Sequence, residues 1–285
     1  MTGRASLLIL IAFAASLGAQ DVPRYGDALY QPRLRQPGKD VMWLPTPEPM
    51  VERMLTMART TSADVVYDLG SGDGRLPIAA AQKFGANAVG IEYDHDLAAL
   101  ARRNAERAGV ARKVTIVEGD IFKEDFTRAT VLTLYLLPDL NQQLRPQILA
   151  MKPGTRVVSH AWDMGEWEPD TTQRVGDGEA FMWIVPARVE GRWALRDASG
   201  FFTGELSLVQ RFQRVGGTLD LRGNVQPVLG AYVEGDILGF TFVALDGGVR
   251  SVRARVYGGS LAGSLNFAGN LTPLTGQRTA TSPGT

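Results

Sequence analysis

A short strand that runs into a glycine-rich turn and then into a helix limits the fold of this chain more than any other feature. The residues are apolar or β-branched over Val65–Leu69, rich in glycine over residues 70–74, and helix-forming over Arg75–Phe84. Glycines let a backbone turn tightly and approach a ligand that a Cβ would repel. The pattern indicates a parallel α/β sheet with a ligand site at the carboxyl end of this strand.

Strands and helices alternate on both sides of that turn. Short apolar runs predict five strands, at residues 65–69, 88–92, 114–117, 129–137 and 156–160. Helical spacing of apolar residues predicts helices at residues 47–59, 75–84 and 96–108, the last capped by Asp96. This order predicts an α/β domain with a Rossmann-like, doubly wound, mostly parallel sheet.

The alternation stops near Pro186, and only strand-like runs follow. They lie at residues 192–195, 205–212, 217–222, 236–243 and 251–256, separated by glycine-rich turn pairs. We expect a meander that closes into a small barrel or sandwich, with Phe181, Trp183 and Trp193 packed at the joint between two domains. The predicted organisation is a lead-in at 20–39, an α/β domain at 40–187, an all-β domain at 188–274 and a flexible tail at 275–285.

The first nineteen residues have the pattern of an export signal. Arg4 precedes an apolar and small-residue run over 5–17, and small residues at 17–19 resemble a cleavage site. We expect export to the periplasm or cell envelope. The alternatives are a membrane anchor that leaves the bulk of the chain in the cytoplasm, a wrongly chosen start codon, or a buried N-terminal helix.

Composition narrows the chemistry. Thirty basic and thirty acidic residues balance, so a general polyanion-binding surface is not expected. The chain has no cysteine and only two histidines, which excludes disulfides and thiolate chemistry and makes a metal site improbable. We therefore expect no metal and no nucleic-acid partner.

The glycine turn departs from the dinucleotide-binding fingerprint. Gly70 and Gly72 fit the G-x-G-x-x-G spacing, but Arg75 stands at the third position and Gly74 comes one residue early. Asp68 precedes the turn, where its carboxylate would repel a pyrophosphate and attract an ammonium group. Asp68, Gly70, Ser71, Gly72 and Gly74 are the first candidate cofactor-binding residues.

Two further acids stand at the ends of the next strands. A carboxylate at Glu92 can accept hydrogen bonds from both hydroxyls of a ribose, and Asp120 can accept one from an adenine amine, with Ile121 against the ring. Each acid alone could equally be a helix cap or a solvated loop residue. Together, at successive strand ends, they predict one binding crevice.

These motifs resemble those of the class I S-adenosylmethionine-dependent methyltransferases. Residues 68–74 are similar to their first motif, Glu92 to their ribose-binding acid, and residues 118–121 to their adenine-binding motif. Residues 44–47, the glycine turn and residues 134–138 resemble the branch that contains mitochondrial protein-lysine methyltransferases and bacterial relatives. The resemblance implies S-adenosyl-L-methionine as cofactor and methyl transfer, with a protein lysine as one candidate acceptor.

Candidates for the acceptor side follow the fourth strand. Tyr135, Leu137 and Pro138 would form an apolar mouth, and desolvation there would lower the pKa of a lysine. No Asn-Pro-Pro-Tyr stretch stands at this place, which argues against transfer to a nucleic-acid base amine. The alternative is that these residues are only the buried end of a strand. His160 and Trp162 could border the same pocket, whereas His95 is expected in a solvated loop.

The sequence thus predicts a methyltransferase that acts on a nucleophile such as a protein lysine amine. The alternatives are a small-molecule N- or O-methyltransferase and a non-enzymatic envelope protein that keeps the fold. Membrane association through the N-terminal segment is a further expectation.

Overall fold

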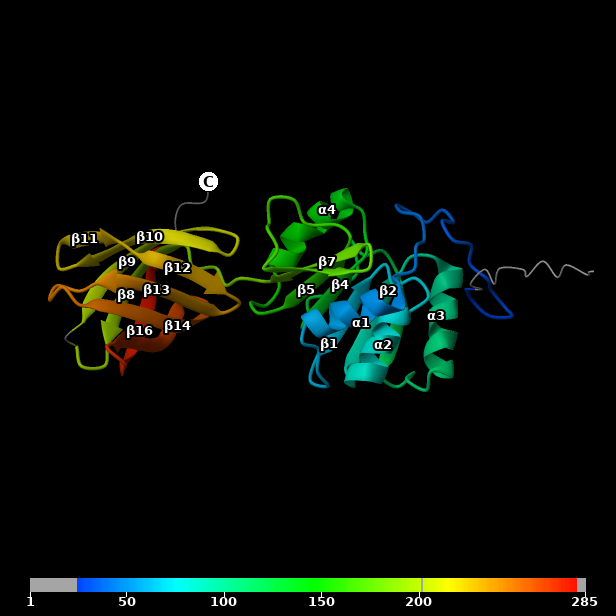
Figure 1. Cartoon of the computed structure of the whole chain (residues 1–285), viewed down its shortest axis with the longest axis horizontal. Coiled ribbons are helices and arrows are strands. Elements are labelled where there is room, and N and C mark those ends of the chain that lie inside the picture. The colour runs from blue at the N-terminus through cyan, green and yellow to red at the C-terminus, as the bar shows by residue number, and fades with distance from the viewer. Residues whose placement is uncertain (1–24, 201, 281–285) are drawn as a thin grey trace, which may run out of the picture.

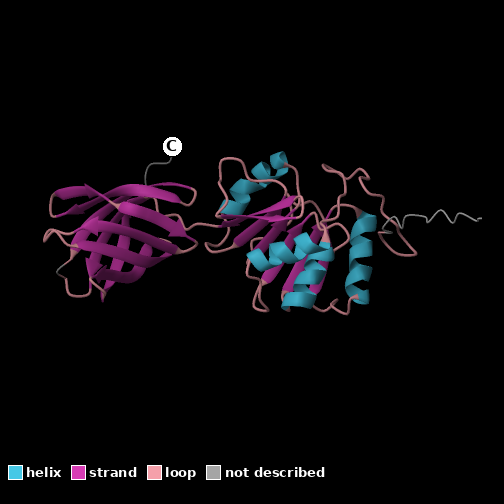
Figure 2. Cartoon of the chain, viewed as in Figure 1, coloured by secondary structure: helices cyan, strands magenta, loops and turns pink. Residues whose placement is uncertain are grey.

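The computed structural model describes residues 25–200 and 202–280, so the predicted signal at residues 1–19 lies outside the described residues. These residues form two units that lie end to end (Figure 1). One unit layers helices against a sheet, and the other contains strands without helices (Figure 2). The chain passes from one unit to the other near Pro186, but the predicted alternation of strands and helices ends earlier, because the last helix ends at Leu149 and only strands follow it.

The first unit contains four helices and seven strands. The helices are α1 (Glu48–Met57), α2 (Arg75–Phe84), α3 (His95–Arg107) and α4 (Pro138–Leu149). The strands are β1 (Val65–Leu69), β2 (Asn87–Glu92), β3 (Val114–Glu118), β4 (Val131–Leu134), β5 (Arg156–His160), β6 (Thr171–Val175) and β7 (Gly178–Ile184).

The strands of this sheet lie in the order β3-β2-β1-β4-β5-β7-β6. All neighbouring strands up to β5 are parallel, and β7 is antiparallel to both β5 and β6. The chain therefore changes direction across the sheet between β1 and β4, and open α/β sheets bind their ligands at such a switch point. The predicted Rossmann-like sheet is confirmed.

Alternating side chains of the strands point to two separate cores. Val66, Val131 and Val158 pack with helices α1, α2 and α3 on one face. Tyr67 and Leu132, one residue along, pack on the opposite face with α4 and the segment after β3. The sheet is covered on both faces, which explains its nearly continuous apolar strands.

Local signals explain most helix ends, with one correction. Gly85 adopts a left-handed φ of 72° at the end of α2, a conformation that favours glycine. The cap of α3 is Asp94, which accepts a hydrogen bond from the backbone N–H of Leu97, and not Asp96 as predicted. Asp96 instead lies in the first turn, where a carboxylate is favourable because of the helix dipole.

The second unit is an all-antiparallel barrel. Its strands are β8 (Gly191–Asp197), β9 (Thr203–Arg211), β10 (Arg214–Leu221), β11 (Asn224–Pro227), β12 (Leu229–Glu234), β13 (Ile237–Val243), β14 (Val249–Tyr257), β15 (Ser260–Phe267) and β16 (Asn270–Ala280). Each strand pairs with the next, except that β11 and β12 share the same edge of β10, so eight positions surround the barrel. Of the two predicted closures, barrel and sandwich, the structure has the barrel.

The last strand closes this barrel. β16 pairs with β15 on one side and with β8 on the other, from Leu274↔Asp197 to Ala280↔Arg192. The prediction of a flexible tail from residue 275 is therefore wrong as far as Ala280. Leu274 is almost fully buried inside the barrel, and Arg278 stacks over the Trp193 ring at 4.5 Å.

The aromatic residues expected at the joint lie elsewhere. Trp183 is fully buried in the α/β unit, where its ring lies 6.2 Å from that of Phe181, and Trp193 is fully buried in the barrel core. The ring that does cross the joint is Phe212, which stacks on Trp167. Within residues 25–200 and 202–280, no helix has both the length and the apolar character needed to cross a bilayer.

Candidate active site

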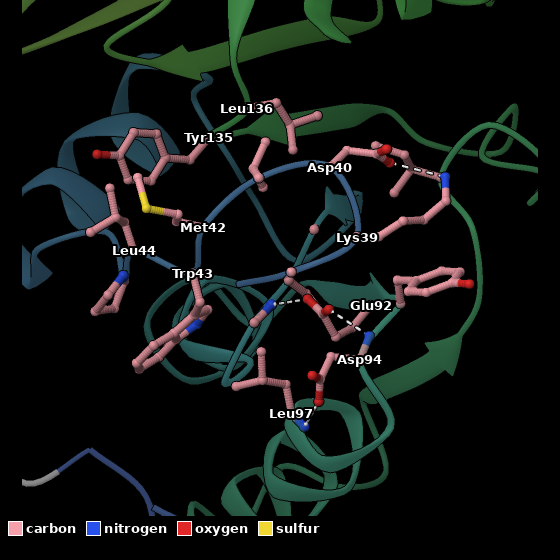
Figure 3. Close-up of a pocket in the computed structure, with 18 of the residues that line it drawn as sticks. Lys39, Asp40, Met42, Trp43, Leu44, Glu92, Asp94, Leu97, Tyr135 and Leu136 are labelled. Carbon is pink, nitrogen blue, oxygen red and sulfur yellow. Dashed lines mark hydrogen bonds and ion pairs between the residues drawn. The ribbon is translucent and has the colours of Figure 1, made fainter. Parts of the chain in front are cut away.

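A cavity of about 390 Å³ opens at the carboxyl ends of the parallel strands (Figure 3). Its floor consists of the residues that end β1, β2 and β4 and those that follow β3. Its cover consists of residues 36–46, a stretch that we call the covering segment. The cavity lies at the topological switch point, where the sheet order predicts a ligand.

Asp68 lies on β1 at the cavity floor and is only 6% exposed. The Thr133 hydroxyl donates a 2.7 Å hydrogen bond to one of its carboxylate oxygens. Burial, opposed by the Thr133 hydrogen bond and assisted by the nearby acids Glu92 and Asp73, raises the pKa of Asp68 to about 7. A cation in the cavity would stabilise the ionised form of this carboxyl group.

The glycine turn brings backbone close to the cavity and to the covering segment. Gly70 has φ 79° and Gly72 has φ 53°. A Cβ on Gly72 would lie 2.6 Å from Nε1 of Trp43, so only glycine fits beneath that ring. Gly74 is different, because it does not line the cavity and instead faces Ala101 of α3, 2.9 Å from where its Cβ would be.

Glu92 ends β2 with its carboxylate between the glycine turn and the start of α3 (Figure 3). One oxygen accepts a hydrogen bond from the Gly72 N–H at 2.7 Å, and the other accepts one from the Asp94 N–H at 2.9 Å. Burial raises the pKa of Glu92, and these backbone donors oppose the rise. Each oxygen keeps a further lone pair for a ligand.

Asp120 and Ile121 line the same end of the cavity, after β3. One Asp120 oxygen accepts a hydrogen bond from the Phe122 N–H at 3.0 Å, and the other lies 3.3 Å from Nζ of Lys39. The backbone donor and Lys39 lower the pKa of Asp120. Lys39 also lies over the ring of Tyr93, 5.4 Å from its centroid.

The opposite end of the cavity is apolar and aromatic. Tyr135, Leu136 and Leu137 follow β4 and line it, whereas Pro138 begins α4 and does not. Met42, Leu44, Leu137 and Trp162 are 38–56% exposed around the opening. Large apolar side chains gathered at a cavity mouth mark a contact surface for a partner or ligand.

His160 lies beneath this end and not in it. Its ring is 4.0 Å from that of Tyr135, and Nδ1 has no hydrogen-bond partner. Burial lowers the pKa of His160 to about 4 and raises that of Tyr135, so both side chains are neutral near pH 7. His95 begins α3 and forms a 2.9 Å pair with Glu118, away from the cavity.

The covering segment is the main part of the site that the sequence prediction missed. All its eleven residues line the cavity, and Lys39 and Trp43 are among those closest to the predicted acids and glycines. A bridge between Pro37 and Met42 folds it into a hairpin, and Arg75 anchors it by donating a 2.9 Å hydrogen bond to the carbonyl of Thr46. Its one sequence signal is the stretch 44–47, noted above only as a family resemblance.

A sheet of this order, with a glycine turn and acids at the ends of β1 and β2 and just after β3, defines an S-adenosylmethionine-dependent methyltransferase of class I. Comparison with known proteins agrees. Residues 68–171 match the family model of the ANTKMT methyltransferase domain. The chain is 44% identical over 140 residues to a protein-lysine N-methyltransferase of Saccharolobus islandicus, a match that covers 48% of this chain and 87% of that protein. The chain belongs to this methyltransferase family.

Two further matches differ in the acceptor that they name. The chain is 34% identical over 142 residues to the adenine nucleotide translocase lysine N-methyltransferase of Mus musculus, with 50% of this chain and 61% of that protein covered. It is 51% identical to a crystal structure described as an RNA methyltransferase from Salinibacter ruber in complex with S-adenosyl-L-homocysteine. That match has a TM-score of 0.51 and covers 51% of this chain and 96% of the other.

Proposed function

We propose that this methyltransferase transfers the methyl group to the side-chain amine of a protein lysine. The observation that carries the proposal is the charge of the cavity lining. Six carboxyl groups line it (Asp40, Asp68, Asp73, Glu92, Asp94 and Asp120), against two basic residues, Lys39 and Arg75. Both basic residues are already paired with acids. Such a lining favours a cation over a phosphate backbone.

The residues at the polar end fit S-adenosylmethionine. We assign the buried Asp68 carboxylate to the ammonium group of the cofactor, and the free lone pairs of Glu92 to its ribose hydroxyls. Asp120 and Ile121 would receive the adenine, after Lys39 moves from Asp120 or shares it. Gly70, Ser71 and Gly72 allow the backbone to approach the ligand, whereas Gly74 serves the packing of α2 on α3.

The apolar end suits an amine that must lose its proton before it can attack. When bound, S-adenosylmethionine supplies an activated methyl group, so the protein need mainly align the acceptor and exclude water. Tyr135, Leu137 and Trp162 would surround the acceptor amine, and desolvation there lowers the pKa of a lysine from its usual ~10.4. The side chains of this chain near the opening therefore favour the neutral, nucleophilic amine.

The test is methyl transfer by the full chain to defined acceptors. One arm contains synthetic peptides with a single central lysine, and a second contains the same peptides with arginine at that position. A third arm contains total RNA, and a fourth contains free small amines. We expect only the lysine peptides to be methylated, which mass spectrometry shows as the added mass of one or more methyl groups. Methylation of RNA without methylation of any lysine peptide would overturn the proposal in favour of an RNA acceptor, and transfer to free small amines alone would favour a small-molecule enzyme.

We also propose that residues 1–19 direct the chain to the periplasm or cell envelope. The sequence pattern supports this, namely a basic start, an apolar run and small residues before a polar stretch. Cell fractionation with sequencing of the mature N-terminus tests it. An intact N-terminus in the membrane fraction would instead support an anchor with the methyltransferase unit in the cytoplasm.

A further inference from the structure

The loop between β5 and β6, residues 161–170, connects the mouth of the cavity to the barrel. At its start, Ala161 adopts a left-handed φ of 66°, and the Trp162 N–H donates a hydrogen bond to the carbonyl of His160 at 2.9 Å. A turn of this tight kind is rare and strained. It places Ala161 and Trp162 on the cavity lining, at the apolar end.

Side chains of α4 hold the first half of this loop. The buried Asn141 amide donates hydrogen bonds to the carbonyls of Trp162 at 3.2 Å and Asp163 at 3.1 Å. Arg145 donates one to the carbonyl of Met164 at 2.7 Å. These bonds fix the backbone of the loop next to the cavity but do not fix its second half.

The second half is held by β7 and by the barrel together. From β7, the indole N–H of Trp183 donates a 2.7 Å hydrogen bond to the carbonyl of Trp167. The barrel supplies contacts to the side chain of Trp167 and to Glu168. Phe212, in the turn between β9 and β10, stacks on the fully buried Trp167 with ring centroids 6.1 Å apart and planes 19° apart. The Gln213 side chain donates a 2.7 Å hydrogen bond to the carbonyl of Glu168. The guanidinium of Arg145 lies over the ring of Phe212, 5.6 Å from its centroid. The barrel therefore also contacts the side chain that donates a hydrogen bond to Met164.

The conformation of Phe212 shows that this contact has a local cost. The turn joins Arg211 to Arg214 through two residues, and Phe212 has a φ of 55°. Hairpin turns of this length normally place glycine, asparagine or aspartate at left-handed positions, and a bulky aromatic residue there is an outlier. The ring of Phe212 nevertheless belongs to the core cluster of the α/β unit and not to that of the barrel.

We propose that the barrel is a positioning domain for acceptor binding. Through Phe212 and Gln213 it fixes the loop 161–170, and through that loop it fixes Trp162 at the apolar mouth where the acceptor enters. Phe212 is a positioning residue, since it lies outside the cavity and acts through Trp167. Among the described residues, no hydrogen bond or ion pair joins Asp68, Glu92 or Asp120 at the cofactor end to the loop. The role of the barrel in acceptor binding rests on the proposed lysine activity, whereas its role in fixing the loop does not.

The experiment compares four variants of the full chain. Phe212→Ala removes the ring, Phe212→Gly removes it while relieving the backbone, and Phe212→Trp restores an aromatic surface. Phe267→Ala removes a ring elsewhere in the barrel, at the end of β15. We expect Phe212→Ala and Phe212→Gly to speed amide hydrogen exchange in residues 161–170 by about three- to tenfold, the size expected for losing one aromatic pair. The KM for a lysine peptide that the wild-type chain methylates should rise by a similar factor, while the dissociation constant for S-adenosylhomocysteine stays within twofold.

Phe212→Trp should restore exchange and KM, and Phe267→Ala should leave both unchanged. Unchanged exchange in residues 161–170 of Phe212→Ala would overturn the proposal, as would an equal loss of affinity for S-adenosylhomocysteine. If Phe212→Ala does not fold, Gln213→Ala tests the same contact by removing the hydrogen bond to Glu168. If no lysine peptide is methylated by the wild-type chain, the proposed function fails by itself, and the exchange measurement still decides whether the barrel positions the loop.

Discussion

Asp68 is a carboxyl group that the fold buries without a basic partner. Its only side-chain hydrogen bond comes from Thr133, and its pKa is raised to about 7 by burial and by neighbouring acids. In the free protein the contribution of Asp68 to stability therefore falls as the pH rises from about 4 to about 7, because the unfolded chain releases this proton at a lower pH than the folded chain does. A cationic ligand would stabilise the ionised carboxylate of Asp68 and so offset this loss of stability.

The first prediction follows from this titration. In the proposed assignment the ammonium group of S-adenosylhomocysteine pairs with ionised Asp68, so affinity should rise about tenfold between pH 6 and pH 7.5 and then level off. Calorimetric titration at several pH values measures it. Asp68→Asn should bind more weakly at pH 7.5, show no such rise, and melt at a higher temperature than the wild type at pH 8. A wild-type affinity that does not change with pH would contradict the assignment of Asp68.

The second prediction concerns Glu92. Glu92→Gln leaves one oxygen to accept a backbone N–H and turns the other position into a donor that faces a donor. A hydrogen bond to a charged group contributes roughly 1.5–3 kcal/mol, so affinity for S-adenosylhomocysteine should fall about ten- to a hundredfold. The melting temperature of Glu92→Gln should also be lower than that of the wild type, because Glu92 orders the glycine turn through its hydrogen bond to Gly72. Glu118→Gln, at the paired position on β3, is the matched control and should change neither quantity.

At this scale the sequence predicted the acids better than the glycines. Acids at strand ends face the crevice because the strand direction and the period of two place them there, so Asp68 and Glu92 line the cavity as expected. Gly74 follows Gly72 by two residues in the same motif but packs against a helix, and only the position of α3 decides this. Lys39 was missed because no local pattern links it to Asp120, 81 positions later.

The covering segment is the element that completes the site. Trp43 is 8% exposed and rests on Gly72, and its neighbour Met42 is 56% exposed at the cavity mouth. These two neighbouring residues of the hairpin therefore have different roles. Trp43 packs on the glycine turn, and Met42 borders the opening of the cavity.

The third prediction separates those tasks. Trp43→Ala removes a large buried ring, a change that typically costs about 3–5 kcal/mol, so the melting temperature and the affinity for S-adenosylhomocysteine should both fall. Met42→Ala should leave both unchanged and raise only the KM for a lysine peptide. Thermal melts with and without S-adenosylhomocysteine, and peptide kinetics, measure these effects. Equal behaviour of the two variants would contradict the division.

Elements with regular patterns were predicted well and irregular ones were not. The bounds of β1, α2 and β5 agree with the predicted residues, because an apolar run or a helical period is bounded by glycine or polar residues. Helix α4 was missed since Pro146 lies inside it, and β16 was read as loose because Pro273 and Gly276 interrupt it. β16 pairs with its neighbour β15 and also with β8, about 80 residues earlier, and no local signal shows the second pairing.

The whole molecule combines a catalytic unit of a known family with a barrel. Ala187 and Val189 already pack in the barrel core, which places the boundary at Pro186. Across that boundary the α/β unit contributes Trp167 and Glu168, and the barrel contributes Phe212 and Gln213. The cofactor end of the cavity lies on the far side of the α/β unit from these contacts.

The fourth prediction follows from that distance. A chain that ends at Pro186 should bind S-adenosylhomocysteine within about threefold of the full chain, and it should melt at a lower temperature because Trp167 loses the ring that covers it. Calorimetry and melting curves of both chains measure this. A folded shortened chain that does not bind S-adenosylhomocysteine would show that the barrel takes part in the cofactor site.

The closure of the barrel by β16 also has a consequence for biosynthesis. The α/β unit is complete once residue 184 has left the ribosome, whereas the barrel cannot close until Ala280 has done so. Until then, β8 and β15 each present an unpaired edge, and such edges recruit other strands. A stop codon before Leu274 would thus leave the methyltransferase unit intact and attach it to an open sheet that is prone to aggregate.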